Sequence, residues 1–281
     1  MCADKVELPL ALPPEALGQA PGRSRLEERR ILVVGAGQRE NDDADAPIGN
    51  GRATAMLCAR EGAVVACADR DLDAAQETTA SIKAEGANAI AIEADASVEE
   101  DVNRMVEAAA DSLGGLDGLV MNVGVGIAQG QWLAGTSVDD WDKTFAINTR
   151  GHFLSVKKAL EVLEPGSSIV FVSSIASIKP GSRLPAYDAS KAALTALNRH
   201  VAFEGARAGI RSNVVVLGLI DTPLGRLATA GRPNRAKTPV PLGRQATAWE
   251  VAYATVFLLS NEASYINGHE LVIDAGLTSV R

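Results

Sequence analysis

The chain has 281 residues, of which 47% are hydrophobic and only 4% aromatic, and its formal net charge at pH 7 is −8. Proteins that bind along the phosphate backbone of nucleic acids are usually basic, so nucleic-acid binding is not expected for a chain this acidic. No apolar run is long enough to cross a bilayer, and the N-terminus lacks the basic start and apolar core of a signal peptide. A core of Ala, Val, Leu and Ile is expected, which suits a parallel sheet covered by helices.

The three cysteines, Cys2, Cys58 and Cys67, form no paired framework and no CxxC motif. Reduced thiols and a cytoplasmic location are therefore expected. The three histidines show no metal-ligand spacing with one another or with a cysteine, so the sequence predicts no metal site.

Residues 1–28 contain four prolines and no sustained apolar period. They are predicted to form an N-terminal extension that is either flexible or packed as an arm. Residues 29–281 are predicted to form one domain, because strand and helix patterns alternate along them with short linkers except near 221–246.

The predicted strands are 31–34, 63–68, 89–93, 117–121, 168–172, 212–217 and 270–273. The predicted helices are 51–61, 71–85, 98–113, 139–163, 187–208 and 247–260. This alternation predicts an α/β fold with a doubly wound, Rossmann-type sheet of seven parallel strands and helices on both faces. Ligands are then expected at the carboxyl ends of the strands.

Glycines gather between the first strand and the first helix. Gly35 and Gly37 follow the strand, while Gly49, Asn50 and Gly51 open the helix. Glycine permits the turn and lets a pyrophosphate approach bare backbone, and the helix N-terminus offers unpaired N–H groups. The cluster predicts a dinucleotide site.

The second strand ends at Asp69, whose carboxylate can accept hydrogen bonds from both hydroxyls of an adenosine ribose. An alternative role as a helix N-cap falls equally well to Asp71, which leaves Asp69 for the cofactor. Arg70 has the opposite effect, since a base beside the ribose can hold the extra phosphate of NADP. Because Asp69 is present, NAD is predicted in preference to NADP.

A second group of residues carries the chemistry. Ser173 and Ser174 end a predicted strand, and Tyr187 and Lys191 follow at i and i+4 on one helix face. Together with the glycine cluster and Asp69, this set resembles the single-domain short-chain dehydrogenase/reductase family over about residues 29–281.

The resemblance implies further site residues. Asn148 corresponds to the family's fourth catalytic residue, and Tyr187 and Lys191 also hold the cofactor. Additional cofactor contacts are implied for Asp95, Ala96, Asn122, Gly124, Ile220 and Thr222.

The chain also departs from the family pattern. Val34 replaces a Thr, Leu217 replaces a Pro, and about ten extra residues divide the glycine motif before Gly49. The acidic insertion 38–48 includes Asp42, Asp43 and Asp45.

The implied mechanism interconverts a secondary alcohol and a ketone. Tyr187 transfers the proton, and a cation such as Lys191 at about 4 Å favours the phenolate by roughly 4 kcal/mol at an effective dielectric near 20. Ser174 donates to the substrate oxygen, with Ser173 as the alternative donor. Asn148 either steadies a water that links Lys191 to solvent or only packs as an amide.

Several alternatives stay open. A basic rim could attract an anionic substrate, or its charges could simply be solvated; its members are Lys179, Arg183, Arg226, Arg232, Arg235 and Lys237. Trp132 and Trp141 could line the pocket or pack beneath it. A non-catalytic NAD-binding regulatory or scaffold protein and an enoyl reductase are the competing functions. The partners expected are a small alcohol or carbonyl substrate and copies of the chain, since alanines at 189, 192, 193 and 196 form a small-residue face suited to a homotetramer.

Overall fold

The computed structural model describes residues 11–38, 45–126, 132–230 and 238–280. Its main sheet has seven parallel strands in the order β3-β2-β1-β4-β5-β6-β9. These strands are β1 (Arg30–Val34), β2 (Val64–Asp69), β3 (Ala89–Glu93), β4 (Leu116–Met121), β5 (Leu163–Ser174), β6 (Arg211–Leu217) and β9 (Glu270–Ile273). The predicted doubly wound fold is confirmed.

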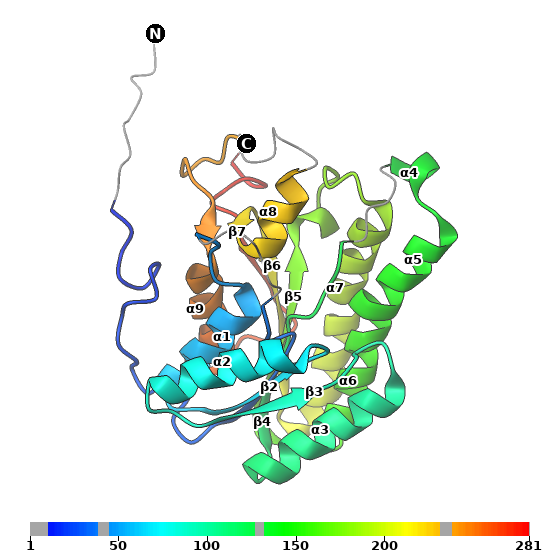
Figure 1. Ribbon diagram of the computed structural model, residues 1–281. Helices are drawn as coiled ribbons and strands as arrows, with labels where there is room; N and C mark the ends of the chain where they lie inside the picture. Colours follow the sequence, from blue (N-terminus) through cyan, green and yellow to red (C-terminus); the bar gives the residue numbers. More distant parts are fainter. Residues whose placement is uncertain (1–10, 39–44, 127–131, 231–237, 281) are drawn as a thin grey trace.

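Helices cover both faces of the sheet (Figure 1). One face carries α1 (Asn50–Arg60), α2 (Leu72–Ala84) and α9 (Ala248–Leu259). The other carries α3 (Glu99–Leu113), α6 (Gly151–Ala159) and α7 (Pro185–Gly205), with α5 (Val138–Phe145) beside α7.

The apolar run of β1 explains why the strand sits at the centre. Ile31 and Val33 pack in the cluster under α1 and α9, whereas Leu32 and Val34 pack in the cluster under α3, α6 and α7. Because successive side chains of a strand point to opposite faces, a continuous apolar run fits a strand that is covered on both sides.

The prediction of one long helix over 139–163 is wrong at its C-terminal end, and the observed helical segment is irregular at its centre. A π-helical turn, Ala146–Arg150, separates α5 from α6, and α6 ends at Ala159. The strand β5 then begins at Leu163, five residues before its predicted start, because Leu163 pairs with Leu116 of β4 across a register shift. This long-range pairing satisfies backbone groups that local sequence would leave in a helix or loop.

The long linker also contains structure that the sequence did not reveal. Two short parallel strands, β7 (Ile220–Asp221) and β8 (Ala246–Thr247), bring its ends together. Between them lies α8 (Pro223–Ala230). A further short helix, α4 (Trp132–Gly135), precedes α5.

Residues 11–28 lie against α1 and α9. Leu26 is fully buried in the core cluster of that face. The buried carboxylate of Glu61, at the end of α1, accepts hydrogen bonds from the backbone N–H groups of Arg23 and Arg25. It also accepts one from the Arg25 guanidinium at 2.7 Å. Within the described residues, no helix has the length and apolar character needed to cross a membrane.

Candidate active site

The candidate site lies where the strand order reverses. β1 sits between β2 and β4, so the connections that leave β1 and β4 run to opposite sides of the sheet. The carboxyl ends of two such strands leave a crevice in which ligands bind in doubly wound folds. The residues predicted to hold a cofactor or substrate come mostly from the loops at this edge of the sheet.

The glycines after β1 form a cradle with no room for side chains. Gly35 has a φ of 82°, and a Cβ built on it would lie 2.7 Å from the backbone nitrogen of Val123. A Cβ on Gly51 would lie 1.9 Å from the carbonyl oxygen of Gly35. Asn122 closes the turn by donating from Nδ2 to that same oxygen at 2.7 Å.

The first turn of α1 faces this cradle. Its N-cap residue, Gly49, supplies no capping side chain, so the first N–H groups of the helix are suited to an anion. The Oδ1 atom of Asn50 is buried and has no hydrogen-bond partner in the part of the chain that the structure describes. A close turn, bare backbone and a helix N-terminus fit the diphosphate of a dinucleotide.

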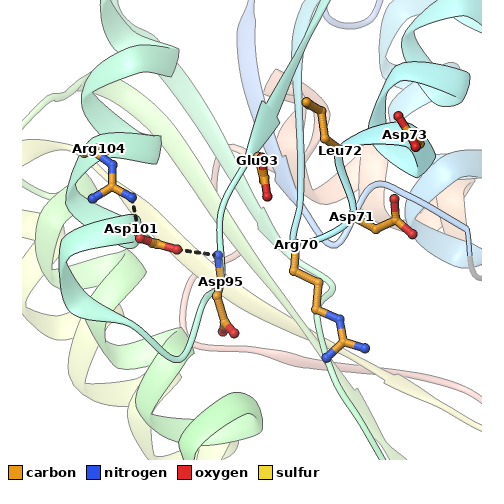
Figure 2. Close-up of a pocket in the computed structure, with 8 residues that line it drawn as sticks. All are labelled: Arg70, Asp71, Leu72, Asp73, Glu93, Asp95, Asp101 and Arg104. Carbon is orange, nitrogen blue, oxygen red and sulfur yellow. Dashed lines mark hydrogen bonds and ion pairs between the residues drawn. The ribbon is translucent and has the colours of Figure 1, made fainter.

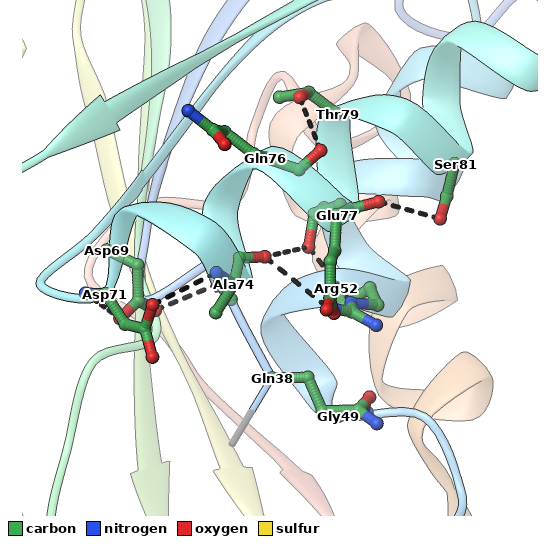
Figure 3. A network of polar contacts seen from close by, with 12 residues as sticks. Gln38, Gly49, Arg52, Asp69, Asp71, Ala74, Gln76, Glu77, Thr79 and Ser81 are labelled. Atoms are coloured by element: carbon green, nitrogen blue, oxygen red, sulfur yellow. Dashed lines mark hydrogen bonds and ion pairs between the residues drawn. The ribbon is translucent and has the colours of Figure 1, made fainter. Parts of the chain in front are cut away.

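The two ends of the acidic insertion are joined near the base of the cradle. The side chain of Gln38 accepts a hydrogen bond from the backbone N–H of Gly49 at 2.7 Å (Figure 3). Arg39, Glu40, Asp42 and Asp43 lie outside the described residues. The remaining predicted acid, Asp45, is exposed, and its carbonyl accepts from the Arg226 guanidinium at 3.2 Å.

Asp69 and Asp71, at and just after the end of β2, have different hydrogen-bond partners, and Asp71 has the N-cap role that the sequence allowed it. Asp71 caps α2, since its carboxylate accepts from the N–H of Ala74 at 3.2 Å (Figure 3). Asp69 instead accepts from the backbone N–H of Gly37 at 2.9 Å. The carboxylate of Asp69 is therefore fixed beside the glycine loop.

A cavity of about 860 Å³ opens beyond Asp69, between the ends of β2 and β3 and the starts of α2 and α3. Figure 2 shows the residues that line it: Arg70, Asp71, Leu72, Asp73, Glu93, Asp95, Asp101 and Arg104. Five are acids and two are arginines, and Arg104 is already paired with Asp101. This end of the crevice is thus predominantly acidic.

Asp95 and Ala96, both predicted to contact the cofactor, are held by local contacts. Asp95 accepts hydrogen bonds from the N–H of Ser97 at 2.8 Å and from its hydroxyl at 2.6 Å. Ala96 is buried against α6, where a Cβ on Gly151 would lie 2.6 Å from the Ala96 carbonyl oxygen.

Lys191, Asn148 and Gly124 converge at the other end of the crevice. A Cβ on Gly124 would lie 3.1 Å from Lys191 Nζ and 3.5 Å from Asn148 Oδ1. Lys191 is 4% exposed, and its Nζ donates to the Val172 carbonyl at 2.9 Å. Burial lowers the pKa of Lys191 to about 8. Its Nζ lies 5.8 Å from the centre of the Tyr187 ring, so the phenol and the ammonium share one region.

Asn148 sits in the middle of the π-helical turn and is fully buried. Its Oδ1 accepts from the N–H of Val125 at 2.8 Å, and its Nδ2 donates to the Val125 carbonyl and to the Ser190 hydroxyl. The side-chain amide therefore ties the loop after β4 to the helix of Tyr187 and Lys191. Such π turns occur frequently at functional sites.

The two serines at the end of β5 differ in environment. Ser173 is buried, and its hydroxyl donates to the Lys191 carbonyl at 3.0 Å. Ser174 is partly exposed at the end of the strand, and its hydroxyl accepts from the N–H of Ala176 at 3.2 Å. Only Ser174 presents a hydroxyl hydrogen that no described protein group takes up.

Ile220 and Thr222 begin the linker over the site and are both buried. The Thr222 hydroxyl accepts from the N–H of Gly225 in the first turn of α8. One turn along, Arg226 forms two hydrogen bonds with Asp221, of 2.9 and 3.0 Å.

Several residues that position the side chains of the site were not predicted from the sequence. The carbonyl of Val172 and the hydroxyl of Ser190 position Lys191 and Asn148, and Gln38 pins Gly49. Ser190 precedes Lys191 in the sequence and could have been singled out on that ground. A backbone carbonyl carries no side-chain signal, so Val172 could not.

Comparisons with known proteins agree on one family. A family model described as enoyl-(acyl carrier protein) reductase matches residues 46–278. The chain is 34% identical to 2-(R)-hydroxypropyl-CoM dehydrogenase of Xanthobacter autotrophicus, over 83% of this chain and 95% of that protein. It is 32% identical to cyclopentanol dehydrogenase of Comamonas testosteroni, over 91% and 99%.

A solved structure gives the same result. The short-chain dehydrogenase of Burkholderia cenocepacia, in complex with NADP, superposes with a TM-score of 0.79 at 32% identity. The match covers 91% of this chain and 100% of the Burkholderia chain.

Proposed function

The chain belongs to the short-chain dehydrogenase/reductase family, and we propose that it uses NAD to interconvert a secondary alcohol and a ketone, with Tyr187 as the acid–base group. Its role as an oxidoreductase follows from the family and from relatives named as alcohol dehydrogenases. The observation that carries the assignment of residues is the convergence of Tyr187, Lys191, Asn148 and Gly124 at the edge of the sheet.

Bound NAD supplies the hydride acceptor for alcohol oxidation. Gly35, Gly37, Gly49, Asn50 and Gly51 hold its diphosphate, with Asn122 keeping the turn closed. The remaining contacts are assigned by position to Asp69, Arg70, Asp95 and Ala96 at the adenosine end, and to Gly124, Lys191, Ile220 and Thr222 toward the nicotinamide.

Tyr187 removes the proton from the substrate hydroxyl during oxidation and returns it during reduction. A free phenol has a pKa of about 10 and is a weak base near neutrality. Lys191 is charged below a pKa of about 8. Its positive charge in a buried setting favours the phenolate, because opposite charges attract more strongly where water is excluded.

Ser174 donates its hydroxyl hydrogen to the substrate oxygen and stabilises the charge that develops there. Ser173 is assigned a structural role, because its hydroxyl is already bonded to the Lys191 carbonyl. Asn148 positions the site, since its side chain joins Val125 to Ser190.

The preference for NAD over NADP rests on charge at the adenosine end. Asp69 lies beside Gly37, and the neighbouring cavity has five acids against two arginines. An additional phosphate on the ribose would be repelled there, although Arg70 offsets part of this repulsion.

The oligomer is proposed to be a homotetramer. On α7, Ala192, Ala196 and Phe203 lie at intervals of four and seven residues and are exposed. Ala192 and Ala196 thus form a patch of small side chains suited to packing on another copy, and Phe203 lies further along the helix, beyond exposed Arg199 and His200. A cytoplasmic location is proposed on the two described cysteines, Cys58 and Cys67, which are unpaired and buried.

The enoyl reductase alternative is favoured by the description of the matching family model. Enoyl-thioester reductases resemble this chain in fold but separate Tyr and Lys more widely than the three residues between Tyr187 and Lys191. We therefore place this activity second.

The test is a screen of NAD reduction with secondary alcohols, including hydroxysteroids, sugars and hydroxyacyl thioesters. Reduction of an enoyl thioester by NADH is measured in parallel. Tyr187→Phe is the matched variant, and NADH fluorescence confirms that it still binds cofactor. We expect turnover to fall by about 10²–10⁴-fold. A variant that keeps more than about a tenth of wild-type activity would contradict the role of Tyr187.

A further inference from the structure

Two residues with left-handed backbones meet beside the candidate active site. Trp132 and Arg183 have φ values of 66° and 63°. The N–H of Trp132 donates to the Arg183 carbonyl at 3.0 Å. The guanidinium carbon of Arg183 also lies 5.5 Å from the centre of the Trp132 ring. Residues with a Cβ seldom adopt this conformation, and it persists where the surroundings impose it, often at binding sites.

This pair joins the two loops that flank Tyr187. Arg183 lies four residues before Tyr187, immediately ahead of α7, and Trp132 begins α4 in the connection that follows β4. The same two loops touch again at Gly126, where a Cβ would lie 3.4 Å from Leu184 Cδ1 and 3.9 Å from Tyr187 Cδ2. The guanidinium of Arg183 therefore belongs to the rim on the Tyr187 side.

The rim carries positive charge that the described residues do not neutralise. Lys179 and Arg183 are exposed, and neither has a carboxylate within 4 Å in the described part of the chain. Arg226 on α8 differs, because its guanidinium is held by Asp221. The remaining members of the predicted basic rim, Arg232, Arg235 and Lys237, lie outside the described residues.

Exposed apolar side chains lie on the same loops as these charges. Trp132, Leu133 and Ile178 are 62%, 80% and 53% exposed on the loops that meet at Arg183. On α8, Leu224 and Leu227 are also exposed. Large apolar side chains gathered at the mouth of a site are suited to an apolar ligand body.

We propose that the physiological substrate is an apolar secondary alcohol or ketone that bears an anionic group, which Arg183 and Lys179 bind. This rests on the proposed function, since it concerns the substrate of that same site. The guanidinium carbon of Arg183 lies over the Trp132 ring, and a guanidinium held in this way still has N–H groups to donate to a carboxylate or similar oxyanion. Three residues separate Arg183 from Tyr187 along the chain, so the anionic group is expected several bonds from the reacting carbon.

Two matched substrates test the proposal. One is the octanol with its hydroxyl next to the terminal methyl group, and the other is the hydroxyoctanoate with the same hydroxyl and a carboxylate at its far end. We expect the kcat/KM of hydroxyoctanoate to exceed that of the octanol by about fivefold or more, as for one exposed ion pair. This ratio should fall as salt is added, because the charges are exposed.

Arg183→Gln should lower the ratio of the two kcat/KM values toward one, and Arg183→Lys should retain part of it. Lys179→Gln is a second variant at a side chain with no described partner, so a loss of folding in one variant leaves the other informative. Arg207→Gln is the control. Arg207 also stacks on an aromatic ring, that of Phe203, but at the opposite end of α7, and its substitution should leave the ratio unchanged.

Binding of octanoate and octanamide to the NADH-loaded protein, measured by calorimetry, provides a readout without turnover. Tighter binding of octanoate that Arg183→Gln and Lys179→Gln weaken would support the proposal. Equal affinities, or an octanoate preference that both variants keep, would overturn it while the proposed function stands. If neither alcohol is oxidised and octanoate is still preferred, the proposed function fails and the anion site remains.

Discussion

The Oδ2 atom of Asp69 lies 2.9 Å from the backbone nitrogen of Gly37, so the last residue of β2 accepts a hydrogen bond from the loop that follows β1. The acid proposed to select the cofactor is thereby held by the same loop that is proposed to hold the diphosphate. Its position depends on two backbone contacts, because Oδ1 also accepts from the N–H of Asp71 at 3.2 Å, and the single carbonyl oxygen of an asparagine can keep the one to Gly37.

Asp69→Asn therefore separates charge from position. The asparagine can still accept from Gly37 but no longer repels a phosphate on the ribose. A carboxylate and a phosphate at about 4 Å repel by roughly 4 kcal/mol per unit charge at an effective dielectric near 20. A third of this, about 1.4 kcal/mol, is a tenfold preference. We expect the ratio of kcat/KM with NAD to kcat/KM with NADP to fall about tenfold in the variant. A wild-type enzyme that favours NADP would contradict the assignment.

Ser174→Ala and Ser173→Ala form a matched pair. Removing one donor to a developing oxyanion costs about 10²–10³-fold in turnover, and this loss is expected for Ser174→Ala. Ser173→Ala loses a buried hydrogen bond to Lys191, which is worth about 1 kcal/mol of stability, with a much smaller change in kcat. Turnover and urea unfolding are measured on both variants, and the reverse order of kcat losses would move the catalytic role to Ser173.

Lys191→Met should abolish turnover and stabilise the cofactor-free protein. Burial lowers the pKa of Lys191 from 10.5 to about 8, so burying its charge costs stability at every pH below about 8. Between pH 8 and 10.5 the unfolded chain holds a proton that the folded chain has lost, so stability rises with pH. Burial of the Lys191 charge lowers the free energy of unfolding by about 3 kcal/mol at most.

The measurement is the free energy of unfolding of wild type and Lys191→Met in urea at pH 7 and about pH 10. The variant should be the more stable at pH 7, and its advantage should shrink at the higher pH. An advantage that does not change with pH would show that the ammonium carries no burial penalty.

Glu61→Gln tests the contact between the N-terminal segment and α1. Burial alone would raise the pKa of Glu61, but hydrogen bonds from Arg25 and Arg23 bring it below its usual range. The ionised group therefore stabilises the fold above its unfolded pKa, and this contribution is lost as pH falls through the folded pKa. Breaking a buried pair costs about 3–5 kcal/mol, so Tm should fall by several degrees at pH 7.

Glu85→Gln is the control for this substitution, because Glu85 pairs with Arg60 and its side chain is 33% exposed. Its effect on Tm should be much smaller. The difference in Tm between wild type and Glu61→Gln should narrow as pH falls below the ordinary glutamate pKa of about 4.3, because the unfolded chain then takes up a proton that folded Glu61 does not. An equal fall in Tm for the two variants would mean that the buried Glu61 contact stabilises the fold no more than the partly exposed Glu85 pair does.

Ala196→Arg tests the proposed tetramer. The alanine is exposed in the small-residue patch of α7, so a long charged side chain would block close approach of a second copy. Sedimentation should show a tetramer for wild type and smaller species for the variant. A wild-type monomer at micromolar concentration would end the proposal.

The strands of the main sheet could be predicted because their signal is local. Six of the seven predicted strands agree with the structure to within one residue at each end. In β1, four apolar residues in a row specify a strand covered on both faces. The glycines after β1 and Asp69 could be located at the edge of the sheet because the strands they follow could be predicted, while their role in cofactor binding stays a prediction.

The remaining elements depend on contacts that local sequence does not encode. β7 and β8 are two residues each, and they form only because the ends of the linker meet. The early part of β5 depends on pairing with Leu116. The pairing of Trp132 with Arg183 requires two loops to be brought together, so neither residue could be predicted to have a left-handed backbone.

The π-helical turn at Ala146–Arg150 has a consequence for the tolerance of this helix to insertions and deletions. The N–H of Gly151 bonds to the carbonyl of Ala146, five residues back instead of four, so the turn holds one residue more than an α-helical turn would. Deleting one residue here would let the helix close as a regular α-helix. Because the turn already holds one extra residue, its removal would leave α5 in nearly the same orientation relative to α6, whereas a deletion in a regular α-helix rotates the preceding part by about 100° around the axis. Trp141 and the other residues of α5 would keep their faces and His152 would stay in the core, so a one-residue deletion is more tolerable in this turn than in the regular turns of α5 or α6, and its main effect would fall on the position of Asn148.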